Sequence, residues 1–460
     1  MAQRSMTGRY EIDMTRGAIL PKVLLFAVPL ILTGILQLLY NAADTIVVGR
    51  FAGTEALAAV GSTGSLINLL INLFMGMSVG SSVVIARSFG ANDLPAVRRG
   101  VHTAVTVSLI FGVVVGAVGF FLARPMLELM SSPENVIDLA TTYVRIYFLG
   151  MPFNMLYNFG ASILRATGDT RRPLIYLSIS GLVNVALNLL LVIVFHMSVS
   201  GVAIATVVSQ LISAVLVTAC LIRSEGAIHL DVTSLRVHLD QLKEMARIGL
   251  PAGLQSCLFS ISNVLIQSSV NSFGATVVAG NSAASSLEGF VYTAMNSMHQ
   301  ADQTFASQNY GARQYQRVRR TLWVCLGVCT AIGLIMGLSF LSIGSTLLSL
   351  YNTDPEVIRF GLMRNTIILP TYFLCGCMDT CVGQLRAIGY SIMPMIASLT
   401  GSCLLRIVWI LTIFQVPEFH TLTVLYLSYP VSWALTLIFH LCSYAVVVRK
   451  LPKENEPLPT

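Results

Sequence analysis

The sequence predicts an all-α integral membrane protein with twelve transmembrane helices in two six-helix repeats. Charged residues make up 11% of the chain, against roughly 25% in soluble domains, and apolar residues make up 55%. Twelve apolar segments are long enough to cross a bilayer. The first half also resembles the second at an offset of about 221 residues. A soluble chain could not bury so much apolar surface, so lipid is the expected solvent.

Matching segments at the same place in each half define the repeat. Ser88-Phe-Gly-Ala91 corresponds to Asn309-Tyr-Gly-Ala312, and Leu164-Arg-Ala-Thr-Gly168 corresponds to Leu385-Arg-Ala-Ile-Gly389. Each repeat has an even number of spans, so both share one orientation and are related by an axis along the membrane normal. A duplicated bundle is the usual build of a secondary transporter, with its site between the repeats.

The first repeat begins with a span that contains Pro29. This proline breaks the backbone hydrogen-bond ladder, so it can act either as a fixed packing kink or as a moving hinge. The later spans follow after short connections. The six predicted spans are 18–48, 54–86, 101–123, 136–160, 173–196 and 199–222.

A longer connection leads to the second repeat. Leu235, Leu239, Leu242 and Met245 recur there at helical spacing among charged residues, which predicts an amphipathic helix on the cytoplasmic surface. The second-half spans are predicted at 246–271, 277–305, 321–349, 357–384, 394–415 and 421–448. The expected regions are therefore a cytoplasmic N-terminus (1–17), an N-lobe (18–222), a cytoplasmic linker helix (223–245), a C-lobe (246–448) and a cytoplasmic tail (449–460).

The basic residues predict the orientation of the chain. All but six of the 28 Lys and Arg fall on one side of the predicted spans, and positively charged loops stay in the cytoplasm. Both termini are therefore expected in the cytoplasm. The net charge of +7 follows from this topology, so no nucleic-acid partner is expected.

Several function classes find no support in the residues. The nine cysteines show no metal or disulfide spacing, and packing explains them best. A catalytic set, a metal motif and a phosphate loop are all missing from the sequence, which argues against an enzyme and against drive by ATP. A channel would not need a repeat with an asymmetric carboxylate.

Ionisable and polar residues within the first-half spans mark a candidate site. A charge inside a membrane span is costly and usually functional. Asp44 lies 15 residues after Pro29, while Asn184 and Asn188 share one face of the fifth span, one turn apart. With Thr206 of the sixth span they would form an oxygen cage suited to a proton or a small monovalent cation. The asparagines alone are also explained by hydrogen bonds between helices.

The second half has different polar residues. Glu288 lies in the eighth span, Asp379 in the tenth and Arg406 in the eleventh, and Asp379 corresponds to Asn158 in the first half. One lobe could therefore bind the coupling ion while the other contacts the substrate. The candidates for the substrate cavity are Glu288, Asp379, Arg406 and Asn158. An ion pair between Arg406 and either Asp379 or Glu288 is the structural alternative. His299 and Asp302 follow near the cytoplasmic end of the eighth span.

At these residues the chain resembles the multidrug and toxic compound extrusion (MATE) family, and within it the bacterial DinF-like branch. The resemblance covers nearly the whole chain. It rests on Asn41-Ala-Ala-Asp44-Thr-Ile-Val-Val-Gly49-Arg50, Glu55-Ala-Leu-Ala-Ala-Val-Gly61, Ser88-Phe-Gly-Ala91, and Leu164-Arg-Ala-Thr-Gly-Asp-Thr170 with its echo at 385–391.

The resemblance implies two lobes around a V-shaped cavity and cation-driven antiport of organic cations. It places the coupling-ion site at Asp44, Asn184, Asn188 and Thr206. Many members have a second aspartate at the position of Asn188. The coupling ion can therefore be either H⁺ or Na⁺, and the single negative charge favours H⁺. The acidic residue that some branches have in helix seven has no counterpart in this chain.

The leading hypothesis is therefore an efflux antiporter for amphiphilic, mostly cationic small molecules. We expect it to act as a monomer in the bacterial inner membrane, with H⁺ or Na⁺ as coupling ion and no cofactor. A flippase for lipid-linked saccharides is the alternative, for which Arg145 and Arg406 would have to supply a cationic cavity.

Overall fold

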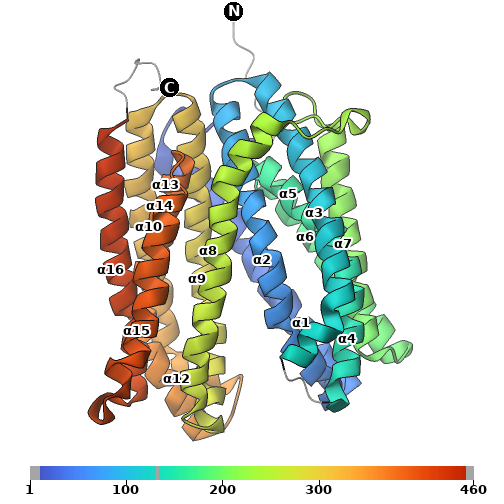
Figure 1. Ribbon diagram of the computed structural model, residues 1–460, viewed down its shortest axis with the longest axis vertical. Coiled ribbons are helices and arrows are strands. Elements are labelled where there is room, and N and C mark those ends of the chain that lie inside the picture. Colours follow the sequence, from blue (N-terminus) through green and yellow to red (C-terminus); the bar gives the residue numbers. More distant parts are fainter. Residues whose placement is uncertain (1–10, 131–133, 452–460) are drawn as a thin grey trace, which may run out of the picture. The chain divides into compact units, whose positions relative to one another are not determined.

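The chain folds into a helical bundle in which every long segment has a counterpart among the predicted spans. The computed structural model describes residues 11–130 and 134–451. In the first half, the helices are α1 (Ile19–Val47), α2 (Thr54–Gly90), α3 (Leu94–Leu129), α4 (Glu134–Leu149), α5 (Met151–Ala166), α6 (Arg171–Leu189) and α7 (Ser198–Arg223) (Figure 1). The predicted fourth span is divided into α4 and α5 at Gly150.

The second half repeats this pattern with more interruptions. Its helices are α8 (Leu239–Asn271), α9 (Ala275–Gly311), α10 (Tyr315–Ser342), α11 (Gly344–Ser349), α12 (Pro355–Ile368), α13 (Phe373–Ala387), α14 (Ile392–Ser398), α15 (Leu405–Leu411) and α16 (Leu422–Arg449). The tenth predicted span corresponds to α12 and α13, which are bent by 45°.

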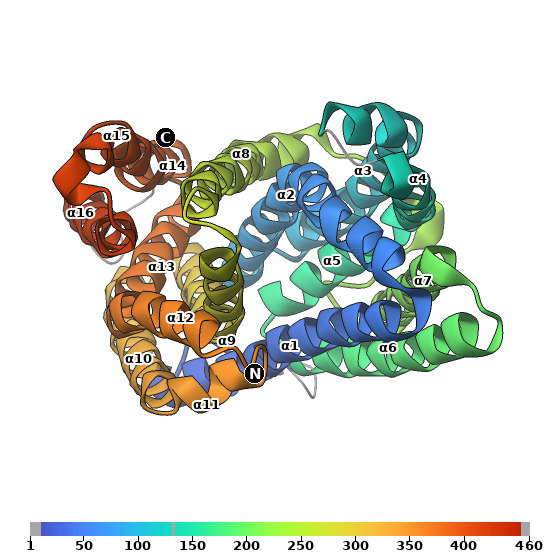
Figure 2. The ribbon, with the colours of Figure 1, turned by 90° about the horizontal axis from the view of Figure 1, so that it is seen from below.

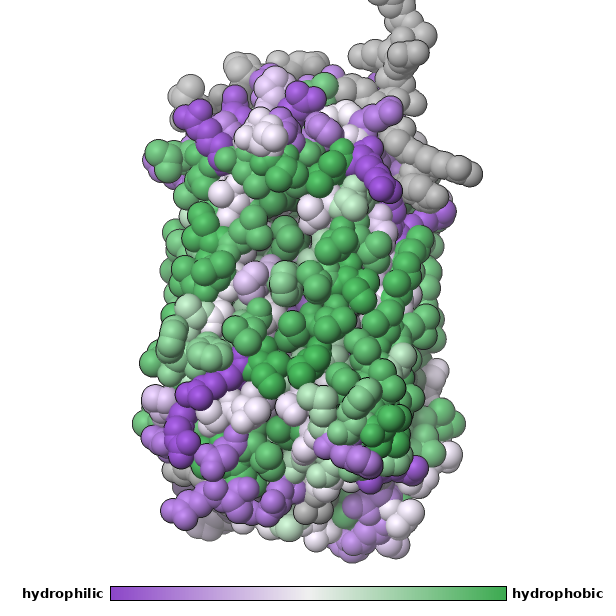
Figure 3. Space-filling model, turned by 90° about the vertical axis from the view of Figure 1, so that its right-hand side faces the viewer, coloured by the Kyte–Doolittle hydropathy of each residue, from purple (hydrophilic) through white to green (hydrophobic). Residues whose placement is uncertain are grey.

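In the part of the chain that the structure describes, most of these helices are long and apolar enough to cross a membrane. Nine helices pass by length and composition, and the bent pair α12–α13 makes a tenth. The predicted spans outside this set are α4–α5 and α9, and α9 is rich in buried polar residues such as Asn281, Glu288 and Asp302. Figure 3 shows one face with hydrophobic residues across its middle and hydrophilic residues toward both ends. Such a band is what a bilayer requires.

Two compact units divide the chain. The described residues of the first unit lie within 11–13 and 32–253, and those of the second within 14–31 and 254–451. The units therefore differ from the predicted lobes at α1 and α8, whose N-terminal parts each belong to the unit of the other half. The lobe boundaries at 18–222 and 246–448 stay a prediction, because compactness and sequence repetition are different criteria.

The N-terminal part of α1 is held in the second unit by α9 and α10. The rings of Phe26 and Phe305 meet edge to face at 5.8 Å. Asn309 Nδ2 donates to the Met14 carbonyl at 3.2 Å, and Arg317 Nη1 donates to the Gly17 carbonyl at 2.8 Å. These contacts fix the start of α1. Pro29 lies shortly before α1 passes to the first unit, and α1 is unbroken there.

The N-terminal part of α8 packs on α2 in the first unit through small residues. A Cβ atom on Gly76 would lie 2.2 Å from the Gly253 nitrogen, and one on Gly80 would lie 2.2 Å from the Met245 carbonyl oxygen. Each helix has two glycines four residues apart, Gly76 and Gly80 in α2 and Gly249 and Gly253 in α8. This small-xxx-small pattern allows two membrane helices to approach closely.

The connection between the halves differs from the predicted linker helix. Residues 224–238 are irregular apart from a 3₁₀ turn, Val232–Ser234, and α8 begins only at Leu239. Thr233 and Ser234 donate to the Asp231 carboxylate, which lowers the pKa of Asp231 to about 2. Ser, Thr and Asp side chains compete with helical hydrogen bonding, so the apolar spacing did not suffice for a helix.

Candidate functional site

The first unit brings together three of the four residues predicted for the coupling-ion site. Asn188 Nδ2 donates a hydrogen bond to Asp44 Oδ1, and the same nitrogen lies 3.2 Å from Asn184 Oδ1. Both asparagines are buried in α6, while Asp44 is half-buried in the last turn of α1. The single carboxyl group of Asp44 therefore contacts Asn188, which is in turn hydrogen-bonded to Asn184 of the same helix.

Thr206 does not share these hydrogen bonds. Its hydroxyl donates to the Val202 carbonyl at 3.0 Å, within its own helix α7. A threonine bonded to the backbone one turn earlier satisfies its donor locally. Thr206 thus remains a predicted member of the cage, and α7 packs against the segments that follow Asp44 and Asn188.

The helices that carry Asp44 and Asn188 both become irregular a few residues after these side chains. α1 continues into a π-helical segment, η1 (Val48–Ala52), and α6 continues into a second one, η2 (Leu190–Val194). The segments η1 and η2 contact each other. Such π-turns are rare and occur frequently at functional sites, because they loosen the helical ladder and re-aim side chains.

A glycine on α6 positions the helix that carries Asp44. The ring of Tyr40, one turn before Asp44, packs directly over Gly181, where a Cβ atom would lie 1.9 Å from the ring. Figure 2 shows α1 running alongside α6. Gly181 therefore permits the close approach that brings Asp44 to Asn188.

Sequence reasoning missed two tyrosines beside this site. Tyr143 and Tyr147 of α4 lie in the neighbourhood of Asp44, and the centroids of their rings are 6.1 Å apart. Their spacing of one helical turn is the signal that could have found them. Asn158 lies elsewhere, in α5, where its amide donates to the carbonyl and side-chain oxygens of Asn154.

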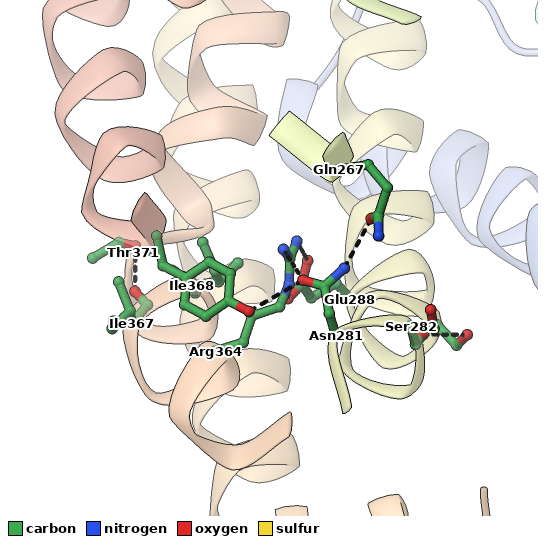
Figure 4. A network of polar contacts seen from close by, with 10 residues as sticks. Gln267, Asn281, Ser282, Glu288, Arg364, Ile367, Ile368 and Thr371 are labelled. Carbon is green, nitrogen blue, oxygen red and sulfur yellow. Dashed lines mark hydrogen bonds and ion pairs between the residues drawn. The ribbon is translucent and has the colours of Figure 1, made fainter. Parts of the chain in front are cut away.

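In the second unit, Glu288 forms a buried ion pair with Arg364 of α12. Arg364 Nε and Nη2 each donate to one carboxylate oxygen at 2.7 Å, and Nη1 donates to Asn281 Oδ1 at 2.8 Å (Figure 4). Asn281 in turn donates to Gln267 Oε1 at 3.0 Å. Glu288 was expected as a substrate contact or as a partner of Arg406. The structure gives it a different partner, because α9 packs against α12.

Asp379 and Arg406 are not joined to each other by any ion pair in the described residues. Asp379 Oδ2 accepts a hydrogen bond from the Tyr292 hydroxyl at 3.2 Å. Arg406 Nε donates to Ser432 Oγ at 2.8 Å. Asp302 is a further buried acidic residue in α9, next to the thiol of Cys325 in α10. Among the described residues, Asp302, Asp379 and Arg406 thus take part in no ion pair.

No three metal-ligating His, Cys, Asp or Glu side chains gather in a suitable arrangement within residues 11–130 and 134–451. The chemistry available at Asp44 is therefore that of one carboxylate with amide neighbours. It can take up a proton or attract a monovalent cation, and either event compensates a charge in a poorly hydrated place.

Comparisons with known proteins agree on one family. The MatE family model matches residues 29–190 and 251–412, once in each half. The chain is 29% identical over 439 residues to the probable multidrug resistance protein YoeA of Bacillus subtilis, covering 93% of each chain. It is 26% identical over 347 residues to an FAD transporter of Shewanella oneidensis, covering 74% of this chain and 76% of that one.

Solved structures share the fold. A MOP-superfamily transporter from Pyrococcus furiosus has a TM-score of 0.89 and 20% identity, covering 96% of this chain and 98% of that one. A MATE transporter in a bent conformation has a TM-score of 0.87 and 20% identity, covering 95% and 97%. The predicted two-repeat helical fold is thereby confirmed.

Proposed function

The chain belongs to the MatE family of multidrug and toxic compound extrusion transporters, and we propose that it exports amphiphilic organic compounds in exchange for a cation bound at Asp44. The hydrogen bond between Asp44 and Asn188, next to two π-helical segments, is the observation that carries this proposal. Organic cations are the expected substrates. Members of this family are membrane transport proteins, and the activity proposed here is transport.

The coupling step acts through α1. This helix begins in the second unit and enters the first between Ile31 and Leu32, two residues after Pro29. Compensating the charge of Asp44 changes how strongly α1 is held against Asn188. A cation can shift a conformational equilibrium only by binding one state better than the other, and Asp44 supplies that difference. Pro29 is the proposed hinge.

Protons are the proposed coupling ion. A Na⁺ site gathers several oxygen ligands, whereas Asn188 directs its donor nitrogen toward Asp44 and the Thr206 hydroxyl is bonded to its own helix. With Asn188 in place of a second carboxylate, the site also has only one negative charge. These features support proton uptake by Asp44.

Location and topology follow from the charge distribution. We propose that the protein acts as a monomer in the bacterial cytoplasmic membrane, with both termini in the cytoplasm. Reporter fusions after residues 125, 230, 354 and 455 should read outside, inside, outside and inside, and residue 455 lies beyond the residues that the structure describes. An outside signal at 230 would contradict this topology. The flippase alternative is not favoured, because relatives that cover most of the chain have multidrug-resistance names.

Reconstituted transport tests the proposed function. Proteoliposomes that contain a cationic dye are given either a pH gradient without Na⁺ or a Na⁺ gradient at equal pH. We expect dye movement with the pH gradient alone. Movement with the Na⁺ gradient alone would reject proton coupling and keep the antiporter, while no response to either gradient would reject coupled export of this dye class.

A further inference from the structure

Basic side chains gather beside an exposed tryptophan at one end of the second unit. Arg319 and Arg320 lie in the second turn of α10, while Arg449 and Lys450 lie at the end of α16 (Figure 1). Arg319 Nη2 donates to the Val448 carbonyl at 3.3 Å, so the start of α10 and the end of α16 are held together. We call Arg319, Arg320, Trp323, Arg449 and Lys450 the Arg319 surface.

Trp323 shares a helix face with the two arginines of α10. It follows Arg319 by four residues and Arg320 by three, and side chains at these spacings are neighbours on a helix. Trp323 is 62% exposed, at the start of a helix that is long and apolar enough to cross a membrane. Exposed tryptophans at such positions lie at the depth of the lipid headgroups. The arginines one turn before Trp323 are therefore at the level of the lipid phosphates.

The four cations of the Arg319 surface have no acidic partner in the described part of the chain. All four are exposed, and none of the ion pairs within residues 11–130 and 134–451 includes one of them. A planar guanidinium matches the oxygens of a phosphate group and can donate two parallel hydrogen bonds to it. The surface is thus complementary in charge to an anionic headgroup.

The first repeat has a covered helix face at the same place. The arginine pair at 98–99 corresponds to the pair at 319–320, and His102 stands where Trp323 stands, three residues after the second arginine. The connection between the halves packs there, because His102 Nε2 accepts from the Asp231 backbone nitrogen at 3.2 Å. His102 is 7% exposed. In the second repeat an exposed tryptophan takes the place of this internal contact.

We propose that the Arg319 surface binds the headgroup of an anionic phospholipid in the cytoplasmic leaflet, where the proposed topology places this end of the unit. Arg319 and Arg320 would donate to the phosphate, and the basic end of α16 would add charge. The Trp323 ring would lie beside the glycerol and the upper part of an acyl chain. This inference goes beyond the proposed export function, because it concerns a lipid partner and not a transported compound.

Trp323 itself reports which lipid lies beside it. Bromine atoms on an acyl chain quench tryptophan fluorescence at short range. The other two tryptophans, Trp409 and Trp433, are replaced by phenylalanine, and the full-length protein is reconstituted with phosphatidylglycerol and phosphatidylcholine, one of them brominated. We expect tenfold or more selection of phosphatidylglycerol at Trp323, because each basic side chain near the surface contributes up to about 1 kcal/mol. Equal quenching by the two lipids would overturn the proposal.

Variants assign the selection to the basic side chains. Arg320→Gln with Arg449→Gln removes one cation from each helix and keeps the bond of Arg319 to Val448, so it should lower the selection about fivefold or more. Arg359→Gln is the matched control, because it removes a positive charge of the same unit from an exposed pair with Glu356, and it should select like the wild type. Wild-type selection in the double variant would reject the site.

A second measurement covers a folding failure of the protein with phenylalanine at 409 and 433. The same quenching is then recorded for the chain with all three tryptophans and for Trp323→Phe, and the difference between them is the signal of Trp323. Equal differences for the two brominated lipids would reject the proposal as before.

Acidic residues of the C-terminal tail are the competing occupant. Glu454 and Glu456 lie among residues 452–460, outside the described part of the chain. Selection of phosphatidylglycerol only after Glu454→Gln with Glu456→Gln would assign the surface to the tail and reject the proposal. The quenching assay needs no ion gradient, so its outcome is separate from the export function. Equal quenching with normal dye transport would reject the lipid site alone, and lipid selection without dye transport would reject the antiporter alone.

Discussion

Neutralising Glu288 should destabilise the second unit, because it leaves Arg364 buried and uncompensated. The Glu288 and Arg364 side chains are 6% and 7% exposed and share two bonds of 2.7 Å. Arg364 also lies over the rings of Tyr426 and Tyr429, at 5.4 and 5.3 Å. Removing one partner of a buried pair costs about 3–5 kcal/mol. Glutamine keeps the shape and one acceptor oxygen, so Glu288→Gln should fall near the lower end of that range.

Thermal unfolding in detergent measures this loss. For a unit of this size, the apparent Tm of Glu288→Gln should fall by roughly 10 °C. Glu356→Gln is the matched control, because Glu356 forms an exposed pair with Arg359 in the same unit. Its effect should stay within about 1 kcal/mol.

A double variant distinguishes a structural pair from a substrate contact. Glu288→Met with Arg364→Met removes both charges, so it should melt above either single variant, and the two positions should be coupled by about 1–3 kcal/mol. The reasoning fails if Glu288→Gln melts like the wild type but binds substrate more weakly. In that case Glu288 would be the substrate contact that its position within a span first indicated.

Two further substitutions test local geometry. Gly181→Ala would bring a Cβ atom to 1.9 Å from the Tyr40 ring, so we expect a loss of about 1–3 kcal/mol in stability and slower coupled transport. Gly61→Ala has open space around it in α2, so it should leave transport unchanged and not lower stability, because alanine is favoured over glycine inside a helix. The Asp231 pKa of about 2 lies below the unfolded value near 3.9, so its contribution to the 224–238 connection is complete above about pH 4 and lost toward pH 2. Pepsin should therefore cut that connection faster in Asp231→Asn than in the wild type at pH 4–5, with the ratio of rates approaching one near pH 2, and a ratio that stays constant with pH would contradict this account.

The proximity of Asp44, Asn184 and Asn188 could be predicted because its signals are local. Asp44 is a charge inside an apolar span, and Asn184 and Asn188 lie one turn apart on one helix, so a shared face follows from spacing alone. The hydrogen bond between Asp44 and Asn188 requires α1 to pack on α6, and the sequence repeat already indicated a bundle of packed helices. Gly181 carries no such signal, because its role depends on which ring lies above it.

The second-unit contacts depend on register between distant helices, which spacing does not determine. Glu288 pairs with Arg364 and not with Arg406, because α12 packs extensively against α9. The predicted linker helix is absent over residues 224–238 for a similar reason, while Leu239, Leu242 and Met245 are helical within α8. Thr233 and Ser234 satisfy Asp231, and His102 Nε2 accepts from the Asp231 backbone at 3.2 Å, so contacts outside the apolar pattern set the conformation.

Transport by Asp44→Asn tests the central claim most directly. Asn preserves the shape of the side chain but cannot take up a proton, and Asp138→Asn is the matched control, because Asp138 lies in an exposed pair with Arg124 of the same unit. In proteoliposomes under an imposed pH gradient, Asp44→Asn should elute and melt like the folded protein, still bind dye and export none, while Asp138→Asn exports at the wild-type rate. Export by Asp44→Asn at the wild-type rate would contradict coupling through Asp44.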